Sequence, residues 1–272
     1  MATVTYQQFY YLPDDEFIEL EGLNAYFEHH KNYDLYKDEM YCPECLQCKL
    51  EYTPEYSRKA YLSAKDVNQH DDACSFKYEP APTKTVTTYF QSLNPTQIES
   101  KLDSMLNRLH RSPKQIQSDS GKLASSNPFI INDGDVDNSP LTHRKVLRQK
   151  KLGRTLRKED QNQLFAFYGT GTLKIEECEG EREGRKYKYY YLYITVNATT
   201  YKVYRGKHHD QIEEEALYNI VLIGYVEGVY TNGIVKIELI KKEPGNSTPN
   251  QLAMVIPPFL IELMGRKSKA LL

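Results

Sequence analysis

Three cysteines stand within seven positions of this chain, and a histidine and another cysteine follow at short spacing. Cys42 and Cys45 form a C-x2-C pair, and after 24 intervening residues His70 and Cys74 form an H-x3-C pair. A C-x2-C turn presents two thiolates on one side of a loop, and zinc prefers four tetrahedral nitrogen or sulfur ligands. The sequence therefore predicts one structural Zn2+ site held by Cys42, Cys45, His70 and Cys74.

Cys48 is a rival for the first pair, because Cys45 and Cys48 also have C-x2-C spacing. We prefer Cys42 with Cys45, since Pro43 suits the turn between them, and whether Cys48 replaces Cys42 stays open. Clustered cysteines in a chain whose N-terminus shows no export signal indicate metal ligation rather than disulfides. Four protein ligands leave no coordination position for water, so the predicted ion is structural rather than catalytic.

This ligand pattern resembles a Cys3His zinc finger of the treble-clef or ribbon type. Similar fingers occur in bacterial nucleic-acid-processing proteins, among them competence-associated proteins with a nuclease-like domain. The resemblance implies the four ligand positions and a small domain stabilised by the ion. The alternative is a set of ordinary buried cysteines in a reducing compartment.

A helix and a polar segment follow the cysteine-rich region. Asn94 caps a predicted amphipathic helix that begins at Pro95, and residues 111–142 have the Ser, Asn, Asp and Gly content of a surface linker. Residues 143–158 contain eight Lys or Arg and no acid, whereas residues 1–40 contain nine acids and two lysines. The basic segment suits either phosphate neutralisation or pairing with the acidic N-terminal region.

From residue 164 onward the pattern changes to that of β-strands, with alternating apolar positions and glycines that permit bends. A short helix is predicted at 210–217, between the third and fourth strands. Three strands, a helix and two strands resemble an OB-fold, a five-stranded barrel, with an SH3-like barrel as the alternative. The predicted fold class is α+β, a small zinc-finger domain plus a five-stranded OB-like β-barrel. The predicted strands span 164–177, 187–196, 199–206, 218–231 and 234–240.

These elements predict a division of the chain into four regions. The longest apolar stretch, 252–264, is interrupted by two prolines and a glutamate and is too short to span a bilayer. We expect a cytoplasmic protein with no membrane contact. The regions are a zinc-finger domain at 1–90, an amphipathic helix and polar or basic linker at 91–163, an OB-like barrel at 164–243 and a C-terminal tail at 244–272.

Alternation along the second predicted strand separates its aliphatic from its aromatic side chains. Leu192, Ile194 and Val196 share one face, expected to line the barrel, so the tyrosines of the other parity project outward. The resemblance to an OB-fold implies that this outer face binds oligonucleotides, with rings stacking on bases and cations contacting phosphates. The residues predicted to bind nucleic acid are Tyr187, Lys188, Tyr189, Tyr191, Tyr193, Lys202, Tyr204 and Arg205.

We therefore expect a non-catalytic protein that binds single-stranded DNA or RNA. The alternative is an accessory or scaffolding subunit of a bacterial multi-protein assembly, such as a defence or mobile-element system. The same surfaces would then contact a protein partner or a second copy of the chain. Five glutamates in the first hairpin and a formal net charge of -2 favour that alternative.

No enzyme is expected from the sequence. Glu99 and Lys101 have the E-x-K spacing found in one class of nuclease site, but they lie on the exposed side of the predicted helix without an acidic partner. Residues 133–144 lack the glycine and the final acid of a calcium-binding loop. Neither pair of adjacent histidines has a nucleophile placed beside it by the sequence.

Overall fold

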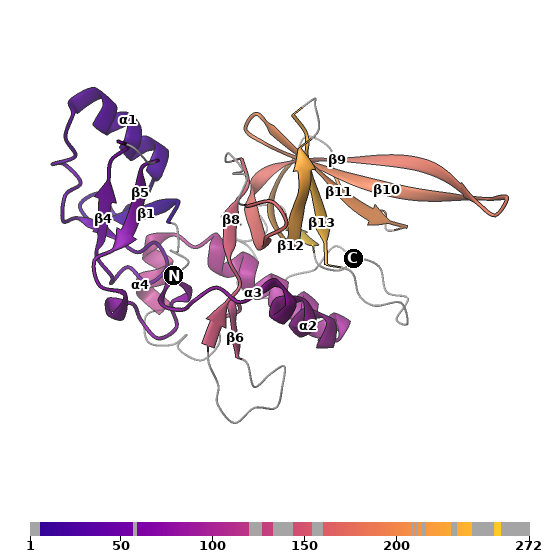
Figure 1. Ribbon diagram of the computed structural model, residues 1–272, viewed down its shortest axis with the longest axis horizontal. Helices are drawn as coiled ribbons and strands as arrows, with labels where there is room; N and C mark the ends of the chain where they lie inside the picture. Colours follow the sequence, from indigo (N-terminus) through magenta and orange to yellow (C-terminus); the bar gives the residue numbers. More distant parts are fainter. Residues whose placement is uncertain are drawn as a thin grey trace. The chain divides into compact units, whose positions relative to one another are not determined.

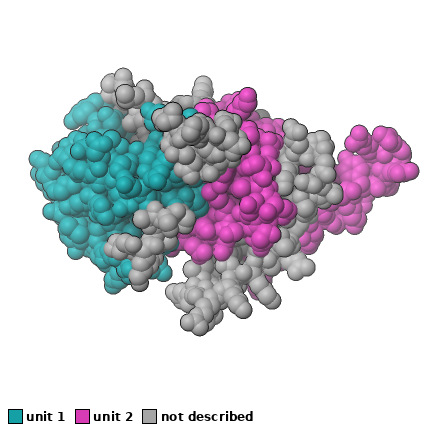
Figure 2. All heavy atoms as spheres, turned by 90° about the horizontal axis from the view of Figure 1, so that it is seen from below, with its two compact units in different colours: residues 1–80, 111–132, 142–146 teal, residues 81–110, 133–141, 147–272 magenta. Residues whose placement is uncertain are grey.

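The computed structural model divides into two compact units, coloured separately in Figure 2, and each contains separate stretches of the chain. Unit 1 comprises residues 1–80, 111–132 and 142–146, and unit 2 comprises residues 81–110, 133–141 and 147–272. This division differs from the one predicted from sequence, because the helical segment after residue 81 groups with the strands of the C-terminal half. The described residues are 6–56, 59–119, 127–132, 144–153, 160–207, 209, 212–213, 216–229, 233–240 and 253–256.

Unit 1 consists of short strands and helices joined by loops (Figure 1). Its elements are β1 (Gln8–Tyr11), β2 (Glu16–Glu19), α1 (Leu20–His30), β3 (Met40–Tyr41), β4 (Leu50–Thr53), β5 (Tyr61–Ala64), η1 (Val67–Gln69), η2 (Ser75–Lys77), α4 (Pro113–Asp119), β6 (Ile130–Asn132) and β7 (Arg144–Val146). β1 pairs antiparallel with both β2 and β3, while β4 pairs with β5 and β6 with β7. These small sheets surround a core of aromatic, aliphatic and cysteine side chains.

Unit 2 combines two helices with one large sheet. Its elements are α2 (Thr83–Ser92), α3 (Pro95–Leu109), β8 (Gln149–Lys151), β9 (Leu164–Arg182), β10 (Arg185–Val196), β11 (Thr199–Gly206), β12 (Leu217–Val229), β13 (Val235–Leu239) and β14 (Ala253–Ile256). The sheet order is β14-β12-β13-β11-β10-β9-β8, and β12 also pairs with β9. Hydrogen-bonded pairing therefore runs through β9, β10, β11, β13 and β12 and returns to β9. The fold as a whole is α+β.

The five predicted strands are confirmed as β9 to β13, and their alternation builds the core of unit 2. Inward side chains of every one of these strands are buried in a single cluster, including Leu173, Leu192, Tyr201, Leu222 and Ile237. β11 and β13 run parallel, whereas the other pairs within the ring of five are antiparallel. Every second residue along each of these strands thus faces the apolar core, which is the pattern that the sequence predicted.

Two glycines allow strands of this sheet to approach one another closely. A Cβ atom added to Gly171 would lie 2.4 Å from the carbonyl oxygen of Thr195, and one added to Gly224 would lie 2.4 Å from that of Glu238. No other residue fits these positions without moving the backbone of the neighbouring strand. Glycines in these strands were expected to permit bends, and the surroundings of Gly171 and Gly224 explain why glycine is required there.

The predicted helix is confirmed as α3, and its N-terminus has a complete capping box. The Asn94 side chain accepts from the Gln97 backbone N–H, and the Gln97 side chain accepts from the Asn94 backbone N–H. Its apolar stripe packs on β12 and β14. Among the described residues, no helix has the length and apolar character needed to cross a bilayer.

Half of the helix predicted at 210–217, namely positions 210, 211, 214 and 215, lies outside the described residues. Those that are described, Ile212, Glu213 and Ala216, are not helical, and Leu217 already belongs to β12. The predicted tail at 244–272 is described only at 253–256, which form β14 and pair antiparallel with β12.

The predicted basic linker is partly folded into both units. Residues 144–146 form β7 of unit 1, and residues 149–151 form β8, which pairs parallel with β9. Lys150 is buried, and its Nζ lies 2.6 Å from Oδ2 of Asp160, whose side chain is buried as well. The part at 154–158 lies outside the described residues. Backbone pairing of β8 with β9 and the burial of Lys150 beside Asp160 therefore hold the described part of this segment in the fold.

Candidate metal centre and tyrosine face

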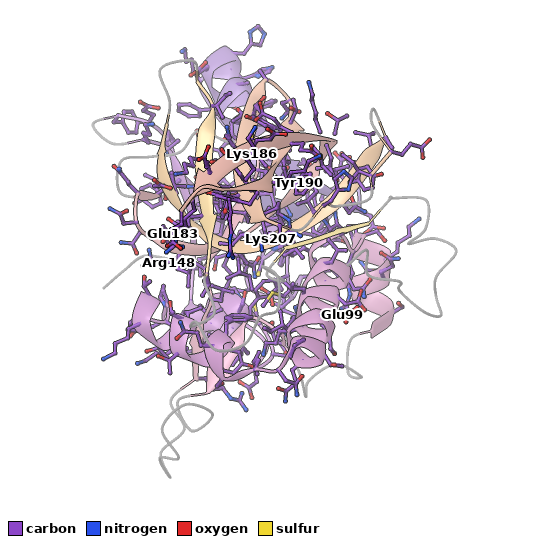
Figure 3. The ribbon with its side chains drawn as sticks, turned by 90° about the vertical axis from the view of Figure 1, so that its right-hand side faces the viewer. Glu99, Arg148, Glu183, Lys186, Tyr190 and Lys207 are labelled. Carbon is purple, nitrogen blue, oxygen red and sulfur yellow. The ribbon has the colours of Figure 1, made fainter. Side chains whose placement is uncertain are left out.

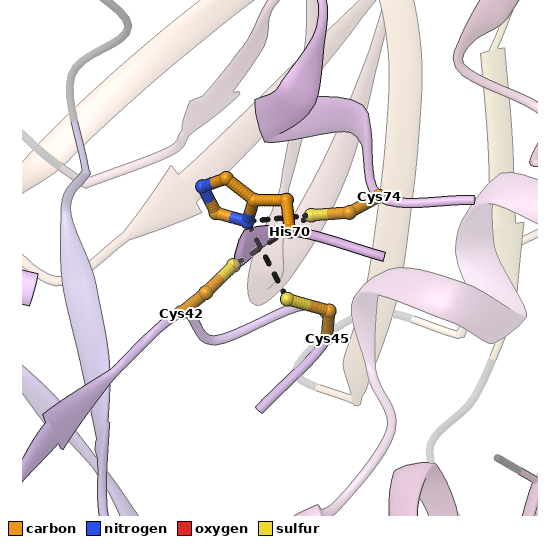
Figure 4. A group of neighbouring side chains, drawn as sticks. All are labelled: Cys42, Cys45, His70 and Cys74. Atoms are coloured by element: carbon orange, nitrogen blue, oxygen red, sulfur yellow. Dashed lines mark hydrogen bonds between the residues drawn. The ribbon is translucent and has the colours of Figure 1, made fainter. Parts of the chain in front are cut away.

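The four predicted zinc ligands come together in unit 1 and form a group that could hold a metal ion (Figure 4). Their ligand atoms all lie within 4.8 Å of one another. The Nδ1 atom of His70 lies 3.4 Å from Sγ of Cys45 and 3.3 Å from Sγ of Cys74, and the sulfurs of Cys42 and Cys74 are 3.7 Å apart. Three sulfurs and one imidazole nitrogen are a donor set that suits zinc.

Local backbone structure brings each ligand into place. Cys42 follows β3, and a tight turn in which Leu46 N–H donates to the Cys42 carbonyl brings Cys45 back beside it. The Glu44 N–H points at the Cys42 sulfur, 3.4 Å away. Leu46 completes the turn with a φ of +58°, in the left-handed region that favours glycine. His70 directly follows η1 and Cys74 directly precedes η2, so two short 3-10 turns position the second pair of ligands.

The His70 ring is oriented by its other nitrogen. Nε2 lies 2.8 Å from the hydroxyl oxygen of Tyr6, whose ring stacks on Phe76 at 4.5 Å between centroids. With a metal ion on Nδ1, Nε2 would carry the proton and donate to Tyr6. Such a second contact fixes the orientation of a metal-binding imidazole. Tyr6 was not identified from sequence, because it lies 64 positions from His70.

The electrostatics of the group favour a bound cation. Burial raises the pKa of the Cys42 and Cys74 thiols, while hydrogen bonds from the thiols of Cys42 and Cys74 lower that of Cys45. Three sulfurs in such close proximity cannot all become thiolates unless a positive charge compensates them. A divalent metal ion supplies that charge, which is why metal binding to cysteine releases protons.

Cys48 stands apart from the group. It is fully buried, and its thiol donates to the carbonyl oxygens of Lys49 and Asp66 rather than facing the other sulfurs. Burial, together with the negative charge of Cys45, raises the Cys48 pKa to about 11, so it stays protonated at neutral pH. The structure therefore brings Cys42, and not Cys48, together with Cys45.

Glu44 ties the two halves of the centre together, a role the sequence did not reveal. Its carboxylate accepts from the backbone N–H of Ser75 at 3.0 Å, from the Ser75 hydroxyl, and from the side-chain amide of Asn127 at 2.8 Å. Asn127 also donates to the Ala73 carbonyl at 2.6 Å. Hydrogen bonds of Glu44 and Asn127 thus link the turn that contains Cys42 and Cys45 to the segment that contains Cys74.

The second candidate site lies in unit 2, where the predicted alternation of β10 is confirmed. Leu192, Ile194 and Val196 are buried, and the tyrosines of the opposite parity point away from this core. We define the tyrosine face as the outward-facing residues of β10 and β11. Its members are Tyr187, Tyr189, Tyr191, Tyr193, Lys202 and Tyr204.

The rings of the tyrosine face lie against one another. Tyr189 is the centre of the cluster, with ring centroids 6.0 Å from Tyr187, 5.7 Å from Tyr191 and 6.0 Å from Tyr204. The Nζ atom of Lys202 lies 3.9 Å from the ring centroid of Tyr191, a cation–π distance. The exposed fractions of Tyr187 and Tyr204 are 41% and 38%, so part of each ring remains accessible.

Part of this face is carried by a projecting hairpin. β9 and β10 extend together beyond the other strands as a two-stranded arm, which we define as residues 176–190 (Figure 1). Glu183 and Gly184, both with positive φ, form its two-residue turn. This turn sets Arg182 opposite Arg185 and Tyr187 opposite Gly180. The Tyr187 ring lies so close over Gly180 that a Cβ there would be 2.5 Å from it.

The register of the arm separates its charges by face. Directly paired residues of antiparallel strands share a face, so Glu177, Glu179 and Glu181 lie opposite Tyr190, Lys188 and Lys186 and point away from the tyrosine face. Tyr190 and Lys186 on that other side are labelled in Figure 3. The charged residues sharing a side with the tyrosines on β9, β10 and β11 are four bases and one acid: Lys174, Arg182, Arg185, Lys202 and Glu176.

Two residues predicted to contact phosphates do not lie on the tyrosine face. Arg205 has the same parity as Tyr201 and Val203 and is only 4% exposed, so its side chain is inside rather than outside the sheet. Lys188 lies on the opposite side of the arm, with Nζ 2.5 Å from Oε1 of Glu177. The structure therefore does not place Arg205 or Lys188 beside the tyrosines, because strand parity turns both side chains to the other side.

Glu99 and Lys101 of α3 are half-buried rather than fully exposed. Lys101 donates to the Tyr89 hydroxyl at 2.6 Å, with its Nζ 4.7 Å from the Tyr89 ring centroid. In the part of the chain that the structure describes, the only group of His, Cys, Asp or Glu side chains able to hold a metal ion is the Cys3His group. Comparison of the chain with protein-family models, with curated proteins and with solved structures finds no match.

Proposed function

We propose that this chain is a non-catalytic single-stranded nucleic-acid-binding protein that binds DNA or RNA on its tyrosine face. Unit 1 holds a structural zinc ion, and β9 to β13 form an OB-like barrel in unit 2. The observation that carries the proposal is the register of β9, β10 and β11, which places four bases and one acid on the side of the tyrosines. The acidic hairpin that weighed against nucleic acid directs three of its glutamates to the other side.

The strand pairing supports an OB-like barrel. Five strands pair in the ring β9-β10-β11-β13-β12 and enclose one apolar cluster, as expected for a small closed sheet filled by side chains. OB-folds bind oligonucleotides on the face of their second and third strands. Here those strands are β10 and β11, which carry the tyrosine face.

Single strands are favoured over duplexes by the chemistry of the face. Tyrosine rings stack on bases that are unpaired and free to leave the helical stack, while basic side chains follow the phosphates. Arg182 and Arg185 are exposed near the end of the arm, and Lys174 and Lys202 flank Tyr193 at its base. A strand lying along the arm would therefore meet positive charges at both ends and a row of rings between them.

The zinc proposal rests on donor chemistry and burial. Three sulfurs and one nitrogen are a known composition for structural zinc, and full protein coordination leaves no position for a reacting water. The group lies in the core of unit 1, where Cys42 and Cys74 are buried. We assign the ion to folding of unit 1 and not to chemistry.

A binding measurement with matched variants tests the function. Fluorescence anisotropy of a labelled oligothymidylate would be compared for the wild type and for a protein with Tyr187→Ala, Tyr189→Ala and Tyr191→Ala together. Each stacked ring contributes about 1–3 kcal/mol, so the triple variant should bind about 100-fold or more weakly. Tyr190→Ala, on the same strand but on the opposite face, is the control and should bind as the wild type does.

The same measurement separates this function from a scaffolding role in a protein assembly. Binding of a nucleic acid through several phosphates weakens steeply as salt concentration rises, whereas an apolar protein interface hardly responds. A circular dichroism spectrum matching that of the wild type would show that the triple variant is folded. Equal affinity of the folded triple variant and the wild type would refute the proposed function and leave the scaffolding role.

A further inference from the structure

An open hollow of about 400 Å³ adjoins the tyrosine face in unit 2. Its size lies within the range of about 300–1,000 Å³ that is usual for small-molecule sites. Tyr191 and Tyr204 belong to both the tyrosine face and the hollow, so a strand bound along the face would reach it. The remaining polar lining consists of Glu227, Lys236 and Glu238, from β12 and β13.

The charged residues of the hollow are held on the outside of the sheet by the strand pattern. Val235, Ile237 and Leu239 of β13 are buried in the core, which turns Lys236 and Glu238 outward. The Nζ atom of Lys236 lies 2.5 Å from Oε2 of Glu227 on the neighbouring strand. This ion pair fixes the position of Lys236 at the hollow.

We propose that this hollow is a subsite for a single guanine base of the bound strand, a proposal that rests on the nucleic-acid function proposed above. The rings of Tyr191 and Tyr204 lie edge to face, with 5.5 Å between their centroids, and together form one apolar wall for a flat base. The two carboxylates repel phosphates, so the hollow accepts a base edge while the backbone stays with the arginines and lysines that share a side with the tyrosines. Single-stranded bases are commonly recognised by hydrogen bonds along their Watson–Crick edges.

Guanine fits the polar groups better than the other bases do. Its Watson–Crick edge offers two neighbouring N–H donors, at N1 and N2, beside the O6 acceptor, and a carboxylate accepts two donors at once. Glu238 accepts from N1 and N2, and Lys236, held by Glu227, donates to O6. Thymine and uracil offer one donor between two acceptors, while adenine and cytosine place an acceptor next to their amino group.

The test compares oligothymidylate with the same oligonucleotide carrying one central guanine, measured by fluorescence anisotropy. We expect the guanine to increase the affinity about tenfold, the size of a good bidentate contact to a base. Replacing that guanine by hypoxanthine, which lacks the N2 amino group, should remove most of the gain.

Glu238→Gln should bind both oligonucleotides with nearly the affinity that the wild type has for oligothymidylate, because the variant loses the double acceptor. The control Glu181→Gln removes an acid from the side of the arm away from the tyrosines and should keep the tenfold preference. If oligothymidylate binds but guanine brings no gain, or if Glu238→Gln keeps the gain, the subsite is refuted and the proposed function stands. If neither oligonucleotide binds, the proposed function fails and the subsite fails with it.

Discussion

The cores of the two units differ in the kind of residue that fills them. In unit 1 the buried cluster includes Cys42, Cys48 and Cys74 together with several aromatic rings, and its strands span two to four residues. In unit 2 the buried cluster consists mainly of Leu, Ile, Val, Phe and Tyr from longer strands, and β9 alone has 19 residues. No cysteine belongs to the buried cluster described for unit 2.

The difference shows two physical ways of holding a fold. Short strands contribute few backbone hydrogen bonds, so the loops around Cys42 and Cys74 depend on ligands that converge on one point. The long strands of unit 2 bury a continuous apolar surface, and burial of each large side chain contributes about 1.5–3 kcal/mol. Unit 1 should therefore respond to loss of a metal ion, and unit 2 to changes in its core.

The largest expected effect follows removal of the metal ion from unit 1. Chelation, or the substitution Cys74→Ser, should abolish the fixed structure of unit 1, because apparent zinc-binding energies of about 10–16 kcal/mol in small fingers exceed the stability of most domains. Hydrogen exchange measured by mass spectrometry should show lost protection in residues 40–78 and retained protection in β12. Metal analysis of the wild type should find one zinc per chain.

Cys48→Ala is the matched control for that prediction. It removes a buried thiol outside the ligand group, so the variant should retain zinc even if unit 1 becomes somewhat less stable. With cobalt in place of zinc, the sulfur-to-metal absorption should weaken in Cys74→Ser but remain in Cys48→Ala. A wild-type protein that contains no metal and is indifferent to chelators would contradict the assignment.

The next effect concerns the pH dependence of unit 2. Burial, aided by the charge of Lys151, lowers the pKa of His110 from 6.5 to about 4, and its Nε2 has no hydrogen-bond partner among the described residues. Above pH 6.5 the ring is neutral in the folded and unfolded states alike. Between pH 6.5 and 4 only the unfolded state binds the proton, so stability falls as the pH falls, by about 3 kcal/mol in total.

Urea unfolding at pH 7 and pH 4.5 checks this loss. In His110→Asn the acid-induced fall in the free energy of unfolding of unit 2 should be smaller than in the wild type by most of that amount. His29→Asn, an exposed position on α1 in unit 1, should leave the fall unchanged. Identical pH dependence in the wild type and His110→Asn would contradict the prediction.

The smallest expected effect is at the turn of the metal centre. Leu46 has a φ of +58°, where a side chain costs about 1–2 kcal/mol, so Leu46→Gly should stabilise unit 1 by up to about 1 kcal/mol. Competition with a chelator would measure this as slower release of the metal. The control Leu12→Gly, at an exposed leucine of the same unit, should lower the stability of unit 1. A similar loss of stability in Leu46→Gly would contradict the prediction and show that side-chain packing outweighs backbone strain.

Local sequence patterns predicted many residues of the two candidate sites. The spacing of Cys42, Cys45, His70 and Cys74 identified the ligand group, because metal-binding turns place such residues at fixed short intervals. Period-two alternation separated Leu192 and its neighbours from the tyrosines. Asn94 and Pro95 marked the start of α3, since capping is a local interaction within the first turn.

Other features depended on which distant segments meet. Tyr6 and Asn127 complete the metal centre from 64 positions before His70 and 83 positions after Glu44, respectively, and no local pattern indicates such contacts. The pairing of Lys150 with Asp160 likewise arises from the packing of β8 against β9. By contrast, the Glu183–Gly184 turn is a local feature: a two-residue turn there fixes which residues of β9 and β10 pair, and so on which side of the arm the glutamates lie.

The sequence by itself determined the candidate ligand group, the strands β9 to β13 and the direction of their side chains, because these depend mainly on short local intervals. Only the tertiary structure decided that β8 and β14 join the sheet, that Lys150 is buried beside Asp160 and that each unit is assembled from separate stretches. Contacts between distant segments arise because each element must bury its apolar face against another, and a residue's neighbours in sequence do not specify them.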